Sequence, residues 1–493
     1  MRVLIIIFVL LLSGIIHAQY SYTPGCMQAH ADISALKFDE AARVLERERV
    51  KDSGNLVPDM LQSYMDFITL MVGEDEADYE RLTEVRGEVL DRLGSGDESS
   101  PWYRYSIARA NLQWAFARVK FDSYFNAALD VRRAYNLLLE NQELFPDFLP
   151  DKLGLGVLHA LIGGIPDNYQ WIAGIFSMKG SVEQGRSELL EVLEKAETED
   201  YPFLKAEALF FISFLDLNLK AEPWQASLLL AYYKDIPGDN LLLVFPRVRI
   251  LMQTGRNEEA IRLLASRPGG KEYYPFYYLD YLEGQCHLNR LDSFADNYFI
   301  RFTTNFKGKN YIKSAYQRTA WCALLRGDTS RYRSEMRKVV SYGTDMVDGD
   351  QLALQDALSG DIPDICLLKA RLLYDGGYYS FADSLLQNIK CPLHTEKDSI
   401  EYPYRRGRIY HALDRHEEAL EWYARAIERG REKPYYFAAN AALQMGFIYE
   451  AGGDAEKAAE MYRQCIRMPK EEYKTSLNQK ARAGLNRIRD KED

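Results

Sequence analysis

The sequence predicts an all-α protein, an α-α superhelix that stacks antiparallel helix pairs as a solenoid. Three observations predict it. Apolar residues recur at three- and four-residue spacing along most of the 493 residues, which is the period of an amphipathic helix, and strand-like alternation is nearly absent. The interruptions are short and rich in glycine, as in turns between antiparallel helices. Near the C-terminus, two successive helix pairs carry small residues and tyrosines at matching positions.

Close helix packing explains the clearest pair, which begins at residue 402. Gly407 lies on its first predicted helix and Ala419 on its second, and two helices approach closely only where small residues face each other. The ring of Tyr410 or Tyr423 is expected to fill the gap one turn further on. Gly446 and Ala458 repeat the arrangement after 39 residues (446 − 407), slightly longer than the ~34 residues of a standard unit.

These residues and spacings resemble the tetratricopeptide repeat (TPR) family over 402–468, and residues 367–389, 248–264 and 38–45 fit the pattern in part. The resemblance implies stacked helix pairs whose first helices line a concave surface, with stability summed over neighbouring repeats. Residues 150–220 also resemble a stretch in the eukaryotic TPR family that includes the inclusion-body clearance protein. That second resemblance implies architecture at most and no function.

A solenoid core runs along the whole chain, so 493 residues need not divide into several domains. We expect degenerate TPR-like repeats over 19–268 and further TPR-like repeats over 271–493, joined as one continuous solenoid. The most turn-rich break is Arg267-Pro268-Gly269-Gly270, where the solenoid is expected to bend.

The first residues predict export. A short positive segment (Met1-Arg2) precedes an almost unbroken apolar run over 3–16, and Ala18 is a small residue at the expected cleavage point. We expect a signal peptide of bacterial style over 1–18 and a periplasmic or secreted protein. An uncleaved membrane anchor is the alternative, although spanning a bilayer takes ~18–20 apolar residues. Cys26 lies too far along the chain for a bacterial lipid anchor, and no later segment is predicted to span a membrane.

Charge and cysteine spacing argue against several partners and cofactors. The formal net charge is −11, and an acidic surface repels phosphate backbones, so nucleic acid is not an expected partner. The six cysteines include no CxxC pair, which disfavours metal knuckles and thioredoxin-like chemistry. Export makes disulfides possible instead. If 365–375 and 378–390 form an antiparallel helical hairpin, its open ends bring Cys366 and Cys391 within disulfide range.

The sequence contains no HExxH, P-loop, GxSxG or GxGxxG motif, so we expect no enzyme, no bound metal and no cofactor. His411 and His416 lie five residues apart with a turn between them, which solvent-facing helix ends explain better than a metal site. The alternative is an enzyme whose site no motif reveals, with the loop over 163–180 as the place to look.

The expected binding surface is the concave face of the two clear repeats. Tyr404, Arg405 and Arg408 lie on one first helix, and Gln444 and Phe447 lie on the next. Two arginines beside an aromatic ring suit an extended peptide or an acidic terminus. A solvated face that binds nothing is the alternative.

The leading hypothesis is an adaptor or scaffold that binds protein partners in a bacterial cell envelope. It depends on the solenoid, the predicted export and the lack of a catalytic motif. The alternative is a periplasmic or surface protein that binds a glycan or another small ligand, because the chain holds 34 Tyr and 22 Phe, most densely over 273–281. Packing of aromatic rings between helices explains the same run without a ligand.

Overall fold

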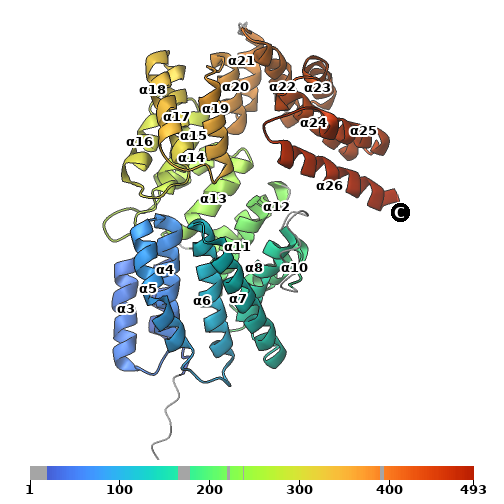
Figure 1. Cartoon of the computed structure of the whole chain (residues 1–493). Coiled ribbons are helices and arrows are strands. Elements are labelled where there is room, and N and C mark those ends of the chain that lie inside the picture. The colour runs from blue at the N-terminus through green and yellow to red at the C-terminus, as the bar shows by residue number, and fades with distance from the viewer. Residues whose placement is uncertain (1–18, 165–177, 219–222, 237, 389–392, 493) are drawn as a thin grey trace, which may run out of the picture. The chain divides into compact units, whose positions relative to one another are not determined.

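The computed structural model describes residues 19–164, 178–218, 223–236, 238–388 and 393–492. Every regular element within these ranges is a helix, and one isolated bridge joins Gln19 to Asn55. The predicted all-α class is therefore confirmed (Figure 1). The predicted signal peptide over 1–18 and most of the loop over 163–180 lie outside the described residues.

The helices form two compact units. Unit 1 comprises Met1–Thr254, Arg262–Leu279 and Asn305–Gly308, and unit 2 comprises Gly255–Ile261, Asp280–Thr304 and Lys309–Asp493. The continuous solenoid expected over 19–268 and 271–493 stays a prediction.

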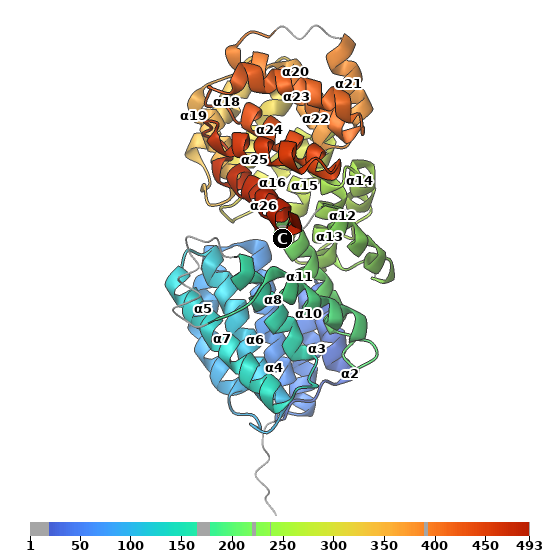
Figure 2. The same ribbon diagram turned by 90° about the vertical axis from the view of Figure 1, so that its right-hand side faces the viewer.

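Consecutive helices of unit 1 pack against each other in pairs (Figures 1 and 2). They are α2 (Pro24–Ser34), α3 (Phe38–Lys51), α4 (Val57–Gly73), α5 (Glu76–Leu93), α6 (Pro101–Lys120), α7 (Tyr124–Leu144), α8 (Pro150–Gly164), α10 (Val182–Lys195), α11 (Leu204–Asn218), α12 (Pro223–Leu228), the 3-10 helix η2 (Leu229–Asp235) and α13 (Leu241–Gln253). The residues of α14 (Asn257–Ala265) are divided between the two units.

The row of helices in unit 1 follows a curved path, so that α2 at its beginning contacts α13 near its end. α2 contacts α4 and also α13. Just after α2, Lys37 forms an ion pair of 2.5 Å with Asp239, which precedes α13. The amide of Tyr274 donates a hydrogen bond of 2.7 Å to the carbonyl of Leu36. Side chains from α2, α4, α6, α8 and α11 share one central core of the unit.

Unit 2 continues the pairwise arrangement through the C-terminal half of the chain. Its helices are α15 (Tyr278–Asn289), α16 (Asp296–Asn305), α17 (Ile312–Leu325), α18 (Thr329–Ser341), α19 (Asp348–Ser359), α20 (Ile365–Asp375), α21 (Tyr379–Asn388), α22 (Glu396–Ala412), α23 (His416–Gly430), α24 (Tyr436–Ala451), α25 (Ala455–Arg467) and α26 (Lys474–Glu492).

The closest contact between α22 and α23 differs from the prediction. Gly407 faces the ring of Tyr423 rather than Ala419, because a Cβ atom at Gly407 would lie 2.5 Å from that ring. Gly446 faces the ring of Tyr462 in the same way one pair later. Both rings are fully buried. The missing side chain of each glycine thus makes room for a whole tyrosine ring.

The predicted hairpin over 365–390 is observed as α20 and α21. Asp364 caps the first of these helices, and its carboxylate accepts a hydrogen bond of 2.9 Å from the amide of Leu367. Cys366 at the start of α20 is disulfide-bonded. Its predicted partner Cys391 lies outside the described residues, so the pairing itself stays a prediction. Within the described ranges, none of the helices combines the length and apolar character needed to cross a membrane.

Candidate functional site

Tyr404, a predicted site residue, lies in the core of unit 2 and not on a binding face. Its side chain is 1% exposed. Its ring packs edge-on against Tyr436 with centroids 5.8 Å apart, and its hydroxyl accepts a hydrogen bond of 2.8 Å from Asn440. The concave face was expected to offer this ring to a ligand. Instead, the ring of Tyr404 packs against rings of α24 and fills the space between α22 and α24.

Arg405 and Arg408 are held by neighbours from several helices. Arg405 is buried and forms an ion pair of 2.7 Å with Glu401, one turn earlier on α22. Arg408 is half-buried and donates hydrogen bonds to the hydroxyls of Tyr374 (2.7 Å) and Tyr404 (2.9 Å). Arg405 also donates a hydrogen bond of 3.4 Å to the hydroxyl of Tyr436 on α24, so the two guanidinium groups connect α20, α22 and α24.

Gln444 and Phe447 lie on α24, further along the chain of repeats. Gln444 donates a hydrogen bond of 3.1 Å to the side chain of Asn440 on its own helix. Phe447 packs edge-on against Tyr462, with centroids 5.8 Å apart. Neither lines the groove described next, which Arg405 does line. A ligand-binding role for the five predicted residues stays a prediction.

A polar groove of about 240 Å³ lies in unit 2 between α19, α20, α22 and the start of α24. Aromatic rings form part of its wall: Trp321, Tyr332, Tyr435, Tyr436 and Phe437. Three cations line it, namely Arg371, Lys397 and Arg405. Its carboxylates are Asp356, Asp361, Asp364, Glu396, Asp398, Glu401 and Glu472. Seven carboxylates against three cations give the lining a formal net charge of −4.

Some of these charges are neutralised locally. Glu401 pairs with Arg405, and Glu396 lies 2.6 Å from Lys433, which is outside the lining. Asp398 accepts the amide hydrogen bonds of a capping box with Thr395 at the start of α22. The carboxylates on α19 and before α26 are not neutralised in this way.

Asp356 and Glu472 are two half-buried carboxylates of the groove. Asp356 accepts a hydrogen bond of 2.6 Å from the neutral amide of Gln317. Glu472 forms no ion pair with any residue in the described part of the chain. Burial raises the pKa of both carboxyls, while Arg371 and Lys397 act in the opposite direction. A cation that enters the groove would stabilise both of them in the ionised form.

The other two cations of the groove, Arg371 and Lys397, rest against aromatic rings. The guanidinium of Arg371 lies 5.1 Å from the ring centroid of Trp321 and forms an ion pair of 3.8 Å with Asp375. The ammonium of Lys397 lies 5.9 Å from the ring centroid of Tyr435. Charged and aromatic groups that few protein partners saturate are suited to binding a second polar chain.

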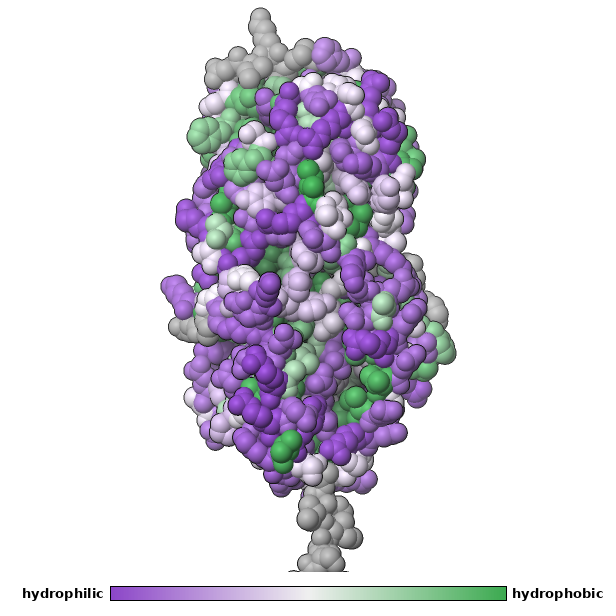
Figure 3. Space-filling view, turned by 90° about the vertical axis from the view of Figure 1, so that its left-hand side faces the viewer, coloured by the Kyte–Doolittle hydropathy of each residue, from purple (hydrophilic) through white to green (hydrophobic). Residues whose placement is uncertain are grey.

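The aromatic run over 273–281 is used largely for packing. Tyr274 stacks on Phe38 with centroids 4.8 Å apart in unit 1, and Tyr281 is 3% exposed in unit 2. On the face drawn in Figure 3, hydrophilic side chains predominate and apolar ones form small separate groups. Among the most exposed large apolar side chains, Val50 and Phe381 lie singly along the sequence, whereas Phe125 is next to the exposed Tyr124.

His, Cys, Asp and Glu side chains of the described residues are the potential metal ligands of the protein. No group of three His, Cys, Asp or Glu among them could hold a metal ion. Burial raises the pKa of Cys322 to about 12 and that of Cys465 to about 11, which keeps both thiols protonated. His416 is exposed, whereas His411 is half-buried and burial lowers its pKa to about 4.

One family model matches part of the chain. The tetratricopeptide repeat model matches residues 399–471, which confirms the repeats predicted over 402–468. No curated protein sequence matches the chain. Among solved structures, "Crystal Structure of the Yeast Tom70" aligns with 94% of this chain and 96% of that chain, at 13% identity and a TM-score of 0.27. A TM-score this low carries no argument about function.

Proposed function

Because the chain carries tetratricopeptide repeats, we propose that it is a protein-binding scaffold and that the polar groove of unit 2 receives its partner. Stacked helix pairs expose an extended inner surface, which suits a segment of polypeptide in an extended conformation. Because one fold can serve many functions, the proposal depends on the groove. Arg405 belongs to it, and residues of α19, α20 and α24 complete it.

The net charge of the groove lining is the observation that carries the proposal. With a formal charge of −4, the groove favours a partner segment that contains lysine or arginine. This differs from the acidic terminus that Arg405 and Arg408 suggest when the sequence is considered alone. The reason is that Arg405 is already paired with Glu401, whereas Asp356 and Glu472 only share the influence of Arg371 and Lys397 and form no ion pair with either.

Lysine and arginine also match the walls of the groove. Their aliphatic stems cover apolar surface, and their charged ends lie favourably over aromatic rings. The ring of Trp321 already holds two cations in this way, Arg318 and Arg371, and the ring of Tyr435 holds Lys397. A partner side chain that reaches Asp356 and Glu472 would therefore be held by charge at its end and by ring contacts along its length.

The test is fluorescence anisotropy with a labelled peptide of alternating lysine and alanine, set against its glutamate counterpart. The lysine peptide is expected to bind, and binding should weaken as salt is added. The double variant Asp356→Asn/Glu472→Gln should lower the affinity by about tenfold or more, because it removes two carboxylates at nearly constant shape.

The matched control is Glu417→Gln/Glu421→Gln, which removes two exposed carboxylates from α23, outside the groove. It changes the net charge of the protein by the same amount. If the control weakened binding as much as the groove variant, or if the glutamate peptide bound as well as the lysine peptide, the groove would not be the site.

We also propose that the protein is exported to a bacterial cell envelope and meets its partner there. The predicted signal peptide over 1–18 supports this, and so does the disulfide at Cys366, since disulfides persist in oxidising compartments. N-terminal sequencing of the protein from its native cells should begin at Gln19. An intact Met1 on protein recovered from the cytoplasm would refute export.

Binding without catalysis is part of the same proposal. Repeat solenoids typically act as scaffolds, and the buried thiols of Cys322 and Cys465 are protonated, as their raised pKa values indicate. In-cell cross-linking followed by mass spectrometry should capture one or a few proteins. The capture should be lost when Asp356 and Glu472 are replaced together, and retained with the α23 control.

A further inference from the structure

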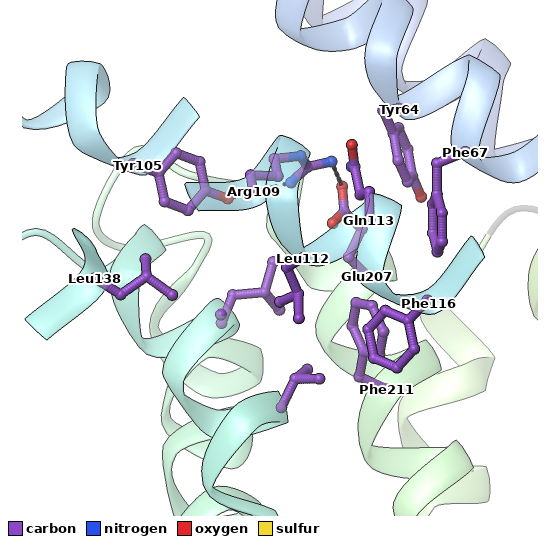
Figure 4. Close-up of a pocket in the computed structure, with 13 residues that line it drawn as sticks. Tyr64, Phe67, Tyr105, Arg109, Leu112, Gln113, Phe116, Leu138, Glu207 and Phe211 are labelled. Atoms are coloured by element: carbon purple, nitrogen blue, oxygen red, sulfur yellow. Dashed lines mark hydrogen bonds and ion pairs between the residues drawn. The ribbon is translucent and has the colours of Figure 1, made fainter. Parts of the chain in front are cut away.

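A second and smaller cavity lies inside unit 1, where α4, α6, α8 and α11 face each other (Figure 4). Its volume is about 40 Å³. Polar groups lie at one end, where Arg109 and Glu207 form an ion pair, and Phe116 and Phe211 lie at the other end (Figure 4). It shares no residue with the groove of unit 2.

The guanidinium of Arg109 is held firmly but one of its N–H groups is unused. One terminal nitrogen donates to Glu207 (2.6 Å) and the other donates to the hydroxyl of Tyr105 (3.1 Å). Its flat face lies 4.7 Å from the ring centroid of Tyr64. Arg109 is 8% exposed, and its buried Nε has no acceptor among the residues that the structure describes. A buried N–H without an acceptor costs about 1–3 kcal/mol.

Glu207 supplies the complementary group. Its Oε1 accepts hydrogen bonds from both Arg109 and His30 (2.5 Å), whereas Oε2 accepts none within the described part of the chain. Burial raises the pKa of Glu207, but Arg109 and His30 hold it at about 2, so the carboxylate is ionised. The polar end of the cavity therefore offers one N–H donor and one oxygen acceptor from an ion pair with no net charge.

The rest of the cavity is apolar and opens between aromatic rings. Its wall is formed by Leu112, Leu138, Leu153 and Val157. Phe67, Phe116 and Phe211 line it as well, and all three are only half-buried, so they reach both the cavity and the surface.

The three phenylalanines begin a longer row of rings. From Phe116 the row passes to Phe211 (6.4 Å between centroids) and Phe210 (5.7 Å), and then to Phe245 (6.4 Å) and Phe276 (6.0 Å). Each of these five rings is half-buried. An apolar chain could lie along the row while one end enters the cavity.

We propose that this cavity binds the head of a neutral amphiphile that carries both a hydrogen-bond donor and an acceptor, such as a primary amide, with its apolar chain on the phenylalanine row. The acceptor meets Nε of Arg109 and the donor meets Oε2 of Glu207. A water molecule needs ~10–15 Å³ and benzene occupies a cavity of ~150 Å³, so 40 Å³ takes a small head group and leaves the chain outside.

Charged head groups fit this site poorly. A carboxylate would lie against the anionic Glu207, and an ammonium would lie against Arg109, and each would lose its hydration on entering. Selectivity for a neutral head over both charged ones therefore distinguishes the site from simple apolar adsorption on the phenylalanines.

Isothermal titration calorimetry of the full chain with octanamide, octanoate and octylammonium tests the proposal. Octanamide is expected to bind at least about tenfold more tightly than either charged analogue. Phe211→Ala should weaken octanamide binding by about tenfold, and Val157→Phe, which fills the cavity, should abolish it. Phe214→Ala is the matched control, because Phe214 lies on the same helix, is exposed and does not line the cavity.

Two results would overturn the inference. Equal affinity for the three compounds would show that Arg109 and Glu207 do not select the head group. No octanamide binding at millimolar concentration by a protein with an unchanged circular dichroism spectrum would show that the cavity holds water only. Neither result bears on the groove of unit 2, so this inference and the proposed function fail separately.

Discussion

His30 on α2 and Glu207 on α11 share a hydrogen bond of 2.5 Å between Nε2 and a carboxylate oxygen, and both side chains are buried. The hydroxyl of Tyr22 lies 2.5 Å from Nδ1 of the same ring. A neutral imidazole satisfies both contacts, with Nε2 donating to Glu207 and Nδ1 accepting from Tyr22. Together with Arg109, this cluster in the core of unit 1 therefore contains one cation, one anion and one neutral histidine.

Removing Arg109 should destabilise unit 1 strongly. In Arg109→Met the carboxylate of Glu207 stays buried without its cation, which costs about 3–5 kcal/mol. The double variant Arg109→Met/Glu207→Gln removes both charges and should lose less. Urea unfolding followed by circular dichroism measures both. A double variant less stable than Arg109→Met would show that the ion pair is not the source of the effect.

His30 should make the stability of the protein fall as the pH falls below about 6.5. Burial lowers the pKa of His30 in the folded state, so the unfolded chain takes up a proton at a pH where the folded chain does not. The stabilisation is present above the unfolded pKa and is lost as the pH drops towards the folded one, by at most about 1.4 kcal/mol per pH unit.

The variant His30→Gln provides the comparison for this pH dependence. Glutamine can donate to Glu207 but does not titrate, so the difference in unfolding free energy between wild type and variant should shrink from about pH 8 to about pH 5. A difference that stays constant over this range would mean that His30 has the same pKa in both states.

Asp151, in the same unit, should make the stability of the protein fall as the pH rises, which is opposite to the effect of His30. Burial raises its pKa to about 7, although Asn141 donates hydrogen bonds of 3.0 and 2.9 Å to its two oxygens. A raised carboxyl pKa gives stability that is present below the unfolded value of 3.8 and is lost as the pH rises through about 7. In Asp151→Asn this loss between about pH 4 and pH 7 should disappear, as urea unfolding at several pH values would reveal. An unchanged pH profile would contradict the assignment.

The repeats over 402–468 could be predicted because their signal is local. Gly407, Ala419 and Tyr423 lie within one helix pair, so their spacing reports the packing directly. The exact contact could not be predicted, since spacing does not reveal whether Gly407 meets the small residue or the ring. The structure shows the ring.

The groove could be predicted only in part. Arg405 lies on a recognisable repeat helix, but Asp356 and Glu472 are 116 residues apart (472 − 356) and lie outside the clear repeats. Only the stacking of helix pairs brings them to one surface. Burial of Tyr404 was also invisible in the sequence, because a tyrosine on a first helix suits either a binding face or the core.

The cysteines should fall into two classes in a thiol count. Cys26, Cys286, Cys322 and Cys465 are free and buried, whereas Cys366 is disulfide-bonded. These four free thiols should react with a maleimide only after the protein is denatured, and Cys366 only after reduction. Peptide mapping without reduction should link Cys366 to Cys391. Reaction of Cys366 in denatured, unreduced protein would refute the disulfide.

Gly407→Ala should destabilise unit 2 although alanine is the better helix former. Its Cβ would lie 2.5 Å from the ring of Tyr423, which is fully buried and cannot move aside freely. Overpacking of this kind costs about 1–3 kcal/mol, against a gain of up to about 1 kcal/mol from helix propensity. Gly349→Ala on α19 is the control, because its Cβ meets only ordinary contacts from 3.6 Å. In urea unfolding the control should be neutral or slightly stabilised. A Gly407→Ala protein as stable as the control would mean that α22 and α23 can separate to admit a methyl group, and that the glycine is not required by the ring.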